Sequence, residues 1–195
     1  MRTFVIATGN ENKVKEFYRM LSPLGYDVKS IKDLNVEIEA EETGTTFEEN
    51  SLIKARDIAS KLGKEFVVIA DDSGLEIKAL GGFPGIYSSR FMEGRPYNEK
   101  CLEIIKRLEG KDDRTANFTS AISLINYVEE DKVFVGKTFG KIDTKIEGEN
   151  GFGYDPIFVS DDLGKSFGLC TLDEKNTVSH RGRALKALLD FIKSN

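Results

Sequence analysis

The sequence has few of the residues from which many metal and redox sites are built. It contains one histidine, His180, and two cysteines, Cys101 and Cys170, which lie far apart. One histidine excludes a zinc site made of several histidines within a single chain. The two cysteines form no metal-binding spacing, so we expect both to be reduced and structural. A metal ion would therefore be held by oxygen ligands, which favours Mg²⁺ or Mn²⁺.

The sequence also lacks a long apolar run and an excess of positive charge. No apolar run approaches the ~20 residues of a membrane-spanning helix, and the N-terminal segment is typical of a strand rather than of a signal peptide. The formal net charge is -5, which argues against binding of duplex nucleic acid. We expect a cytoplasmic protein that contacts neither nucleic acid nor membranes.

Length and composition fit one soluble globular domain, with two lobes as a possibility. Of the 195 residues, 39% are hydrophobic and 31% are charged, values that are ordinary for such a domain. A chain of this size can bury about 70% of its unfolded surface. Because we find no repeat, linker or low-complexity segment, we treat residues 1–195 as a single domain.

Strand and helix patterns alternate along the chain. Helical periodicity predicts helices at 11–21, 46–62, 98–109 and from about 179 to the C-terminal end. Apolar runs and alternation predict strands at 3–8, 28–31, 66–70, 117–128, 132–143 and 157–159, with an acidic strand and loop at 36–46. The turn at 129–131 predicts a hairpin. This order favours an α/β fold with a mixed sheet, and exposed hairpin residues could form a dimer face.

Two adjacent carboxylates, Asp71 and Asp72, directly follow the strand predicted at 66–70. Ser73 and Gly74 come next. Acids at the end of a buried strand lie where an α/β sheet opens onto its usual ligand site. Burying carboxylates there is costly unless cations or hydrogen bonds compensate. The alternative is a solvated turn, since Asp, Ser and Gly all favour turns.

The segment TGNENK lies between a predicted strand and a predicted helix and could bind phosphate. Its glycine lets the backbone turn closely, the helix N-terminus presents N–H groups, and its lysine adds a positive charge. The spacing is not that of a P-loop, and the same residue types also start ordinary helices. The residues concerned are Thr8, Gly9, Asn10, Glu11, Asn12 and Lys13.

Glu41 and Glu42 precede the helix that carries Lys54. Acidic residues near a helix N-terminus are common for electrostatic reasons alone. Together with Asp71 and Asp72, they could instead complete an oxygen-rich Mg²⁺ site, because Mg²⁺ takes one or two carboxylates and keeps several waters.

The segment GFGYDP, residues 151–156, places Phe152 between two glycines. An exposed aromatic ring on a permissive backbone is a good stacking surface for a nucleobase, and Asp155 could accept a hydrogen bond from a base or ribose. A glycine-rich turn with its aromatic side chains folded inward is the alternative.

The segment EKNTVSHRGR, residues 174–183, places cationic or hydrogen-bonding side chains at the entry to the last predicted helix. Cations are unfavourable at a helix N-terminus, so their presence there indicates an anionic or polar ligand. The side chains are those of Lys175, His180, Arg181 and Arg183.

Taken in order, these segments closely resemble the inosine triphosphate pyrophosphatase family, whose enzymes hydrolyse non-standard purine nucleoside triphosphates and so cleanse the nucleotide pool. The matching stretches span nearly the whole chain: TGNENK, ETGTTFEENSLIKA, ADDSGLEIKALGGFPGIYSSRF, GFGYDPIF and KNTVSHRGRAL. The resemblance implies an elongated α/β fold with a central mixed sheet and a cleft between two lobes. It also implies a homodimer, a Mg²⁺ requirement, and cleavage of ITP, dITP and XTP to the monophosphate and pyrophosphate.

The same resemblance implies a role for each matching residue. Thr8 to Lys13 would contact the phosphates, with Lys54 beside them. Glu42 and Asp72 would hold the metal, and Asp72 would accept the proton. Ser73 would touch substrate. The base would be held by Phe152, Gly153, Tyr154, Asp155 and Lys175, and its carbonyl edge would be recognised by His180 and Arg181.

Three other functions are compatible with parts of the sequence. The first is a related pyrophosphatase with another base preference, against which the His180–Arg181 pair argues. The second is a nucleotide-binding regulatory module without turnover, which would not need two metal-capable acids beside a phosphate-binding segment. The third is RNA binding, which the acidic charge balance disfavours.

Overall fold

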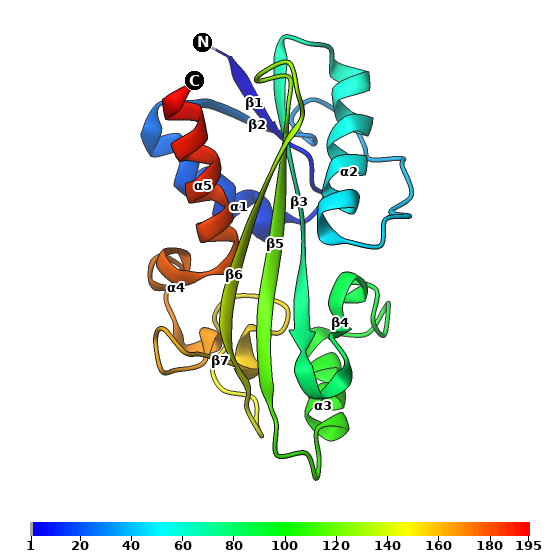
Figure 1. The fold of residues 1–195 in the computed structure, drawn as a ribbon, viewed down its shortest axis with the longest axis vertical. Helices are drawn as coiled ribbons and strands as arrows, with labels where there is room; N and C mark the ends of the chain where they lie inside the picture. Colours follow the sequence, from blue (N-terminus) through cyan, green and yellow to red (C-terminus); the bar gives the residue numbers. More distant parts are fainter. Residues whose placement is uncertain (1) are drawn as a thin grey trace. The chain divides into compact units, whose positions relative to one another are not determined.

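The computed structural model describes residues 2–195, so Met1, the first residue of the predicted domain, lies outside the described part (Figure 1). The chain divides into two compact units. Unit 1 contains the described residues up to Asp72, together with Ala121–Val135 and Ala184–Asn195. Unit 2 contains Ser73–Ser120 and Gly136–Arg183. No helix in the described part of the chain is long and apolar enough to cross a membrane.

The described residues form a mixed sheet with the hydrogen-bonded order β2-β1-β3-β5-β6-β7, and β4 pairs with β3. Strand β1 is parallel to β2 and β3, whereas β3–β4 and β6–β7 are antiparallel pairs. The predicted α/β fold with a mixed sheet is therefore confirmed. The strands are β1 (Thr3–Ile6), β2 (Asp27–Ser30), β3 (Phe66–Ile77), β4 (Phe83–Pro84), β5 (Thr115–Ile125), β6 (Lys132–Ile142) and β7 (Phe158–Ser160).

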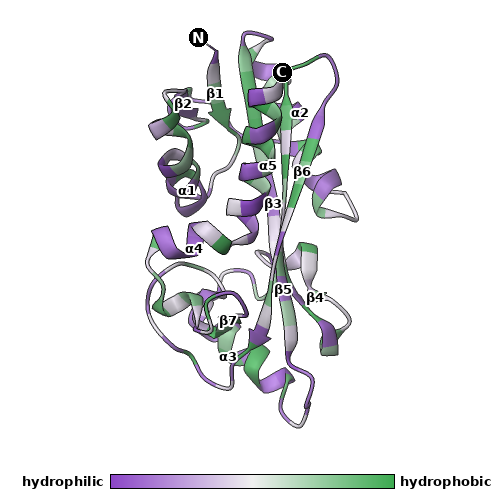
Figure 2. Cartoon of the chain, turned by 60° about the vertical axis from the view of Figure 1, so that its left-hand side comes forward, coloured by the Kyte–Doolittle hydropathy of each residue, from purple (hydrophilic) through white to green (hydrophobic). Residues whose placement is uncertain are grey.

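Five α-helices lie in the described residues: α1 (Glu11–Leu21), α2 (Phe47–Leu62), α3 (Tyr97–Arg107), α4 (Leu172–Val178) and α5 (His180–Ser194). Short 3₁₀ helices occur at Ser22–Leu24, Lys78–Leu80, Gly85–Tyr87, Asp155–Ile157 and Phe167–Leu169. Figure 2 shows α1 mostly in the hydrophilic colour. Only one side of that helix is buried, through residues such as Phe17 and Leu21.

In unit 1, alternate residues of the parallel strands face different helices. Phe4 and Ile6 of β1 pack in a core cluster with residues of α1 and α5. Val5 and Ala7 pack in a second cluster with residues of α2. Figure 1 shows α1 and α5 on one side of β1 and α2 on the other. A parallel strand covered on both faces explains the continuous apolar runs of the sequence.

Unit 2 has a separate core built from β3, α3, β5 and the segments around β7. Its buried residues include Leu75, Ile104, Phe118, Phe158 and Phe167. Both cysteines lie in this core as free, buried thiols, in agreement with the structural role expected for them. Burial raises the pKa of Cys101 to about 12, so this thiol is unreactive at neutral pH.

The prediction that a strand ends at Ala70 is wrong, because β3 continues through the two acids to Ile77. Asp71 and Asp72 are buried side chains with cationic partners. Since these cations compensate the buried negative charges, the chain does not have to turn toward water. The general turn preference of Asp, Ser and Gly is overridden by these tertiary contacts.

The strand predicted within residues 36–46 is absent. The helix predicted from about residue 179 is confirmed as α5, which begins at His180. The expectation that Lys175 lies at the entry to that helix is wrong, because Lys175 lies in the last turn of α4. Thr171 and Glu174 form a capping box that starts α4. Lys175 is therefore near a helix C-terminus, where a cation is electrostatically favoured.

Candidate functional site

Two carboxylates of β3 and one from the loop before α2 meet two lysines in unit 1. The Nζ atom of Lys13 lies 2.7 Å from Oδ2 of Asp71. The Nζ atom of Lys54 lies 2.9 Å from Oδ1 of Asp72 and 2.9 Å from Oε1 of Glu42. We call these five residues the acidic–lysine cluster.

The period of the strand explains why neighbouring acids have different partners. Successive side chains of a strand point to opposite faces. Val67 and Ile69 pack in the core cluster that includes α1, so Asp71 shares their face and meets Lys13 of α1. Val68 and Ala70 pack against α2, and Asp72 on that face meets Lys54 of α2.

Burial makes this cluster electrostatically unusual. Asp72 and Lys54 are each 7% exposed. Burial raises the pKa of Asp72, and the nearby cations of Lys54 and Lys13 offset that rise only in part. Burial alone would lower the pKa of Lys54, but the carboxylates of Asp72 and Glu42 together raise it above its ordinary value. Lys54 is therefore a cation at neutral pH, beside a carboxylate that is more basic than usual.

The second oxygen of Asp72 bears on whether a metal ion fits here. Within residues 2–195, this Oδ2 atom is buried and has no hydrogen-bond partner. A buried acceptor without a partner costs about 1–3 kcal/mol, so an incoming cation or water would relieve that cost. The described residues contain no ready group of three or more His, Cys, Asp or Glu for a metal. Asp72 and Glu42 supply two carboxylates, the number that Mg²⁺ usually takes from a protein beside water and phosphate oxygens.

The TGNENK segment forms the connection from β1 to α1, and Asn10 caps the helix. The Oδ1 atom of Asn10 accepts hydrogen bonds from the N–H groups of Asn12 (3.0 Å) and Lys13 (3.2 Å). The expectation of free N–H groups at this helix start is therefore wrong for these two residues, because the cap engages them. Gly9 is exposed, and a Cβ atom there would meet nothing within 4 Å.

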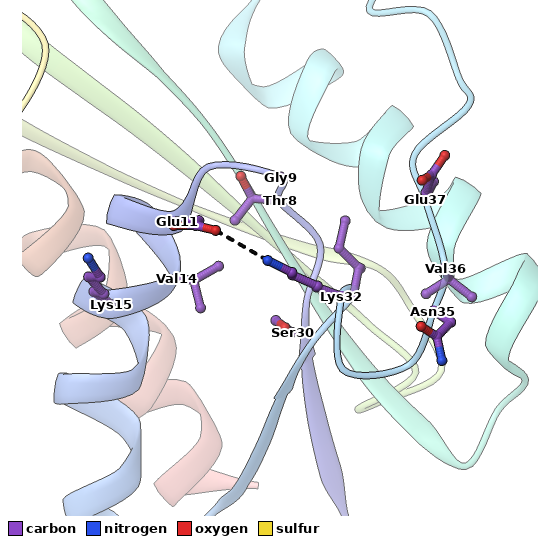
Figure 3. A pocket seen from close by; sticks show the side chains of 11 residues that line it. Thr8, Gly9, Glu11, Val14, Lys15, Ser30, Lys32, Asn35, Val36 and Glu37 are labelled. Atoms are coloured by element: carbon purple, nitrogen blue, oxygen red, sulfur yellow. Dashed lines mark hydrogen bonds and ion pairs between the residues drawn. The ribbon is translucent and has the colours of Figure 1, made fainter.

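A pocket of about 630 Å³ lies beside this segment (Figure 3). Thr8, Gly9 and Glu11 contribute to its lining, whereas Lys13, Lys54 and Asp72 do not. The rest of the lining comes from α1, the last residue of β2 and the chain after it: Val14, Lys15, Ser30, Ile31, Lys32, Asn35, Val36 and Glu37. The Nζ atom of Lys32 lies 3.4 Å from Oε1 of Glu11, the pair joined by the dashed line in Figure 3.

A buried ion pair beside an aromatic ring lies in unit 2. The Nζ atom of Lys175 is 2.7 Å from Oδ2 of Asp155 and 4.6 Å from the centre of the Phe152 ring. The same Asp155 oxygen accepts the N–H of Phe152 at 2.8 Å. Lys175 and Asp155 are each 2% exposed, whereas Phe152 is only half-buried. The expected exposed ring is thus partly covered and remains accessible.

Arg181 and His180 complete what we call the aromatic–cation cluster, together with Phe152, Asp155 and Lys175. The Cζ atom of Arg181 is 5.8 Å from the centre of the Phe152 ring. Its Nη2 donates to Oγ of Ser73 at 2.9 Å. The ring of His180 stacks on Phe118 with centres 4.8 Å apart and planes 14° apart. Arg181 is 2% exposed and His180 5% exposed, so contacts with the protein hold both side chains in place.

Two of the remaining candidate side chains have structural contacts of their own. Tyr154 is buried, and its hydroxyl donates to the carbonyl of Ser88 at 2.7 Å. Arg183 binds Asp162 and a backbone carbonyl rather than the cluster. Gly153 has a φ of +67°, a conformation that glycine adopts easily. Tyr154 and Gly153 therefore shape the loop that carries Phe152 and Asp155.

Sequence reasoning did not single out Phe118, on which His180 stacks, or the link between Asp71 and Lys13. Phe118 lies in the strand predicted at 117–128, but no local pattern pairs it with His180. The Asp71–Lys13 link follows from the strand period once the partner helices are known.

Comparisons with known proteins cover nearly the whole chain. A model described as "Ham1 family" matches residues 4–191. A Bacillus licheniformis protein named dITP/XTP pyrophosphatase is 47% identical over 97% of this chain and 99% of its own length. A Bacillus subtilis protein of the same name is 46% identical over 100% of this chain and 98% of its own length. The solved structure of the Staphylococcus aureus Ham1 protein matches with a TM-score of 0.88, 39% identity and 99% coverage of both chains.

Proposed function

Because this chain belongs to the Ham1 family, we propose that it hydrolyses the non-standard purine nucleoside triphosphates ITP, dITP and XTP to the monophosphate and pyrophosphate. The observation that carries the proposal is the acidic–lysine cluster, in which Asp72 keeps a buried oxygen without a hydrogen-bond partner in the described residues. Similar relatives are named for this activity. The cluster supplies the charges that phosphate hydrolysis needs.

We propose that Glu42 and Asp72 hold Mg²⁺, with Mn²⁺ as a possible substitute. When bound, such an ion offsets the charge on phosphate oxygens. The unsatisfied oxygen of Asp72 and the adjacent Glu42 carboxylate support this assignment.

The residues of unit 1 would orient the phosphates and move the proton. The TGNENK segment and Lys13 would contact the phosphate groups, and Lys54 would stabilise the departing pyrophosphate. Asp72 would take a proton from the water that attacks the α-phosphorus. The water oxygen forms a bond to phosphorus, and the bond to the pyrophosphate oxygen breaks.

The residues of unit 2 would select the base. Phe152 would stack on the purine, beside the Asp155–Lys175 pair. Hypoxanthine and xanthine present a 6-oxo acceptor where adenine presents an amino donor, so donors from His180 and Arg181 would favour the former. Each donor–donor mismatch costs roughly 1–3 kcal/mol. Guanine also has a 6-oxo group, so a backbone N–H facing position 2 would have to repel its amino group.

We further propose a homodimer that acts in the cytoplasm and binds no nucleic acid. Phe139 of β6 is 53% exposed, and an exposed aromatic side chain on a strand is a suitable dimer contact. Light scattering coupled to size-exclusion chromatography tests the dimer. A Phe139→Glu variant should shift the mass toward the monomer.

A pyrophosphate-release assay distinguishes the proposed function from the alternative functions. The substrates are ITP, dITP, XTP, ATP, GTP and dTTP, each with Mg²⁺, with Mn²⁺ and with excess chelator. We expect rapid release from the first three only, and loss of release with chelator. Preferential release from dTTP would instead support a related pyrophosphatase with another base preference. Nucleotide binding without any release would indicate a regulatory module and contradict the proposal.

A further inference from the structure

Glu42 lies in a segment that has no helix or strand to hold it, since residues 41–46 are irregular. Instead, hydrogen bonds to side chains in the first turn of α2 hold this segment. The N–H of Gly44 donates to Oδ1 of Asn50 at 2.8 Å. The N–H and Oγ1 of Thr45 donate to Oε2 of Glu49 at 2.6 and 3.0 Å. The position of the Glu42 backbone therefore depends on side chains of the helix.

Asn50 is the buried member of these contacts. It is 0% exposed, whereas Glu49 is exposed. A Cβ atom on Gly44 would lie 2.6 Å from Oδ1 of Asn50 and 2.7 Å from Cβ of Glu49. The backbone of the segment thus rests directly on Asn50, and only a glycine allows that approach. Because the Gly44–Asn50 hydrogen bond is shielded from water, we expect it to be stronger than the hydrogen bonds from Thr45 to Glu49.

Asn50 and Lys54 hold the segment at two points from one side of the helix. Residues four apart lie one above the other on a helix surface. Asn50 holds the backbone two residues after Glu42, and Lys54 holds the Glu42 carboxylate at 2.9 Å. Both restraints come from α2, so the position of Glu42 is fixed relative to that helix.

The chemistry of Asn50 indicates that its amide oxygen is the required atom. Its Nδ2 group is buried and lacks a hydrogen-bond partner within residues 2–195, which is costly. Aspartate would supply the same oxygen, but it would bury a second, negatively charged oxygen where Nδ2 lies and add a charge near Glu42. Asparagine supplies a neutral acceptor next to a group of carboxylates.

We propose that Asn50 is a positioning residue that holds Glu42 in place for metal binding. This inference rests on the proposed function, because that proposal is what assigns Glu42 as a metal ligand. Residues that orient metal ligands typically contribute 10–100-fold to metal affinity. Asn50 itself need not touch the ion or the substrate.

The test measures Mn²⁺ binding by electron paramagnetic resonance of the free ion, without nucleotide, and hydrogen exchange of the 41–46 segment. We expect Asn50→Ala to weaken Mn²⁺ binding about 10–100-fold and to speed exchange at Gly44 and Thr45. Asn50→Asp keeps the acceptor and should retain slow exchange there. Ile58→Val is the matched control: it alters a buried core residue of the same helix and should leave both readouts unchanged.

The outcomes separate this inference from the proposed function. Wild-type protein that neither binds Mn²⁺ nor releases pyrophosphate from ITP would overturn the proposed function. Wild-type protein that does both, with Asn50→Ala binding Mn²⁺ equally well, would overturn only the role of Asn50. If Asn50→Ala does not fold, Gly44→Ala disrupts the same contact from the other side. Gly44→Ala should then weaken Mn²⁺ binding, and unchanged binding would refute the inference.

Discussion

The acidic–lysine cluster of unit 1 contains three carboxylates and two lysines, whereas the aromatic–cation cluster of unit 2 contains one carboxylate, three cationic or imidazole side chains and an aromatic ring. In the first, each lysine Nζ lies 2.7–2.9 Å from carboxylate oxygens. In the second, the cations of Lys175 and Arg181 lie 4.6 and 5.8 Å from the centre of the Phe152 ring. The first cluster consists of charge pairs alone, whereas the second combines one charge pair, Lys175–Asp155, with an aromatic ring and fixed donors.

This difference suits two different tasks. A cluster of alternating charges can stabilise a developing phosphate charge and move a proton, whatever base is attached. A flat ring with fixed donors can recognise a heterocycle. Variants in unit 1 should therefore change turnover for every substrate alike, and variants in unit 2 should change the preference among substrates.

Asp72→Asn should cause the largest loss. The amide keeps the shape of the side chain but cannot take a proton, so we expect kcat to fall about 10²–10⁴-fold for ITP and for ATP alike. Steady-state pyrophosphate release measures the change. Asp190→Asn, at an exposed position of α5, is the control and should keep wild-type rates. Normal turnover by Asp72→Asn would remove Asp72 from the mechanism.

Arg181→Ala should act on selectivity. Loss of a donor to the 6-oxo group should lower the ratio of kcat/KM for ITP to that for ATP by about tenfold to a hundredfold. This range corresponds to roughly 1–3 kcal/mol for each donor–donor mismatch. Arg183→Ala is the matched control, because Arg183 lies on the same helix but binds Asp162. Circular dichroism checks that each variant folds. An unchanged ITP/ATP ratio would refute the role of Arg181.

Phe152→Leu should weaken binding of all purine substrates by similar amounts. Stacking on an aromatic ring contributes about 1–3 kcal/mol per base, and the ring is half-buried here, so we expect about a tenfold rise in KM with little change in the ITP/ATP ratio. Phe152→Tyr keeps the ring and should stay near wild type. If leucine matches phenylalanine in KM, the ring does not stack on the base.

The sequence predicts more of unit 1 than of unit 2. The TGNENK segment joins a strand to a helix as predicted, and the helices predicted at 11–21 and 46–62 form within one residue of those bounds. Asp71 and Asp72 could have been assigned to opposite faces from the strand period, but their turn preference suggested a strand end. Neighbours in the fold, not local preference, keep that strand extended.

In unit 2 the important contacts join residues that are distant in the sequence. Lys175 pairs with Asp155 across 20 positions, and Arg181 bonds to Ser73 across 108. No local pattern predicts such pairs. One available signal was missed: Thr171 and Glu174 have the spacing of a capping box, which would have placed Lys175 inside a helix rather than before one.

The smallest expected effect concerns the helix that carries Lys175. Glu174 accepts the N–H of Thr171 at 2.8 Å and lies 2.8 Å from Nζ of Lys165. Lys165 and the Thr171 N–H lower the pKa of Glu174 from 4.5 to about 2. A carboxyl with a lowered pKa stabilises the folded state above its unfolded pKa, and this contribution is lost as pH falls toward the folded value.

Glu174→Gln tests this contribution, because glutamine can still complete the capping box but carries no charge. We expect a modest decrease in the free energy of unfolding at pH 7, measured in urea, and a difference from wild type that shrinks as pH falls from about 4.5 toward about 2. Glu109→Gln, at an exposed loop position, controls for the general loss of one negative charge. A difference that stays constant down to pH 3 would show that the charge of Glu174 does not stabilise α4. The placement of Lys175 beside Phe152 would then depend on its ion pair with Asp155 rather than on its helix.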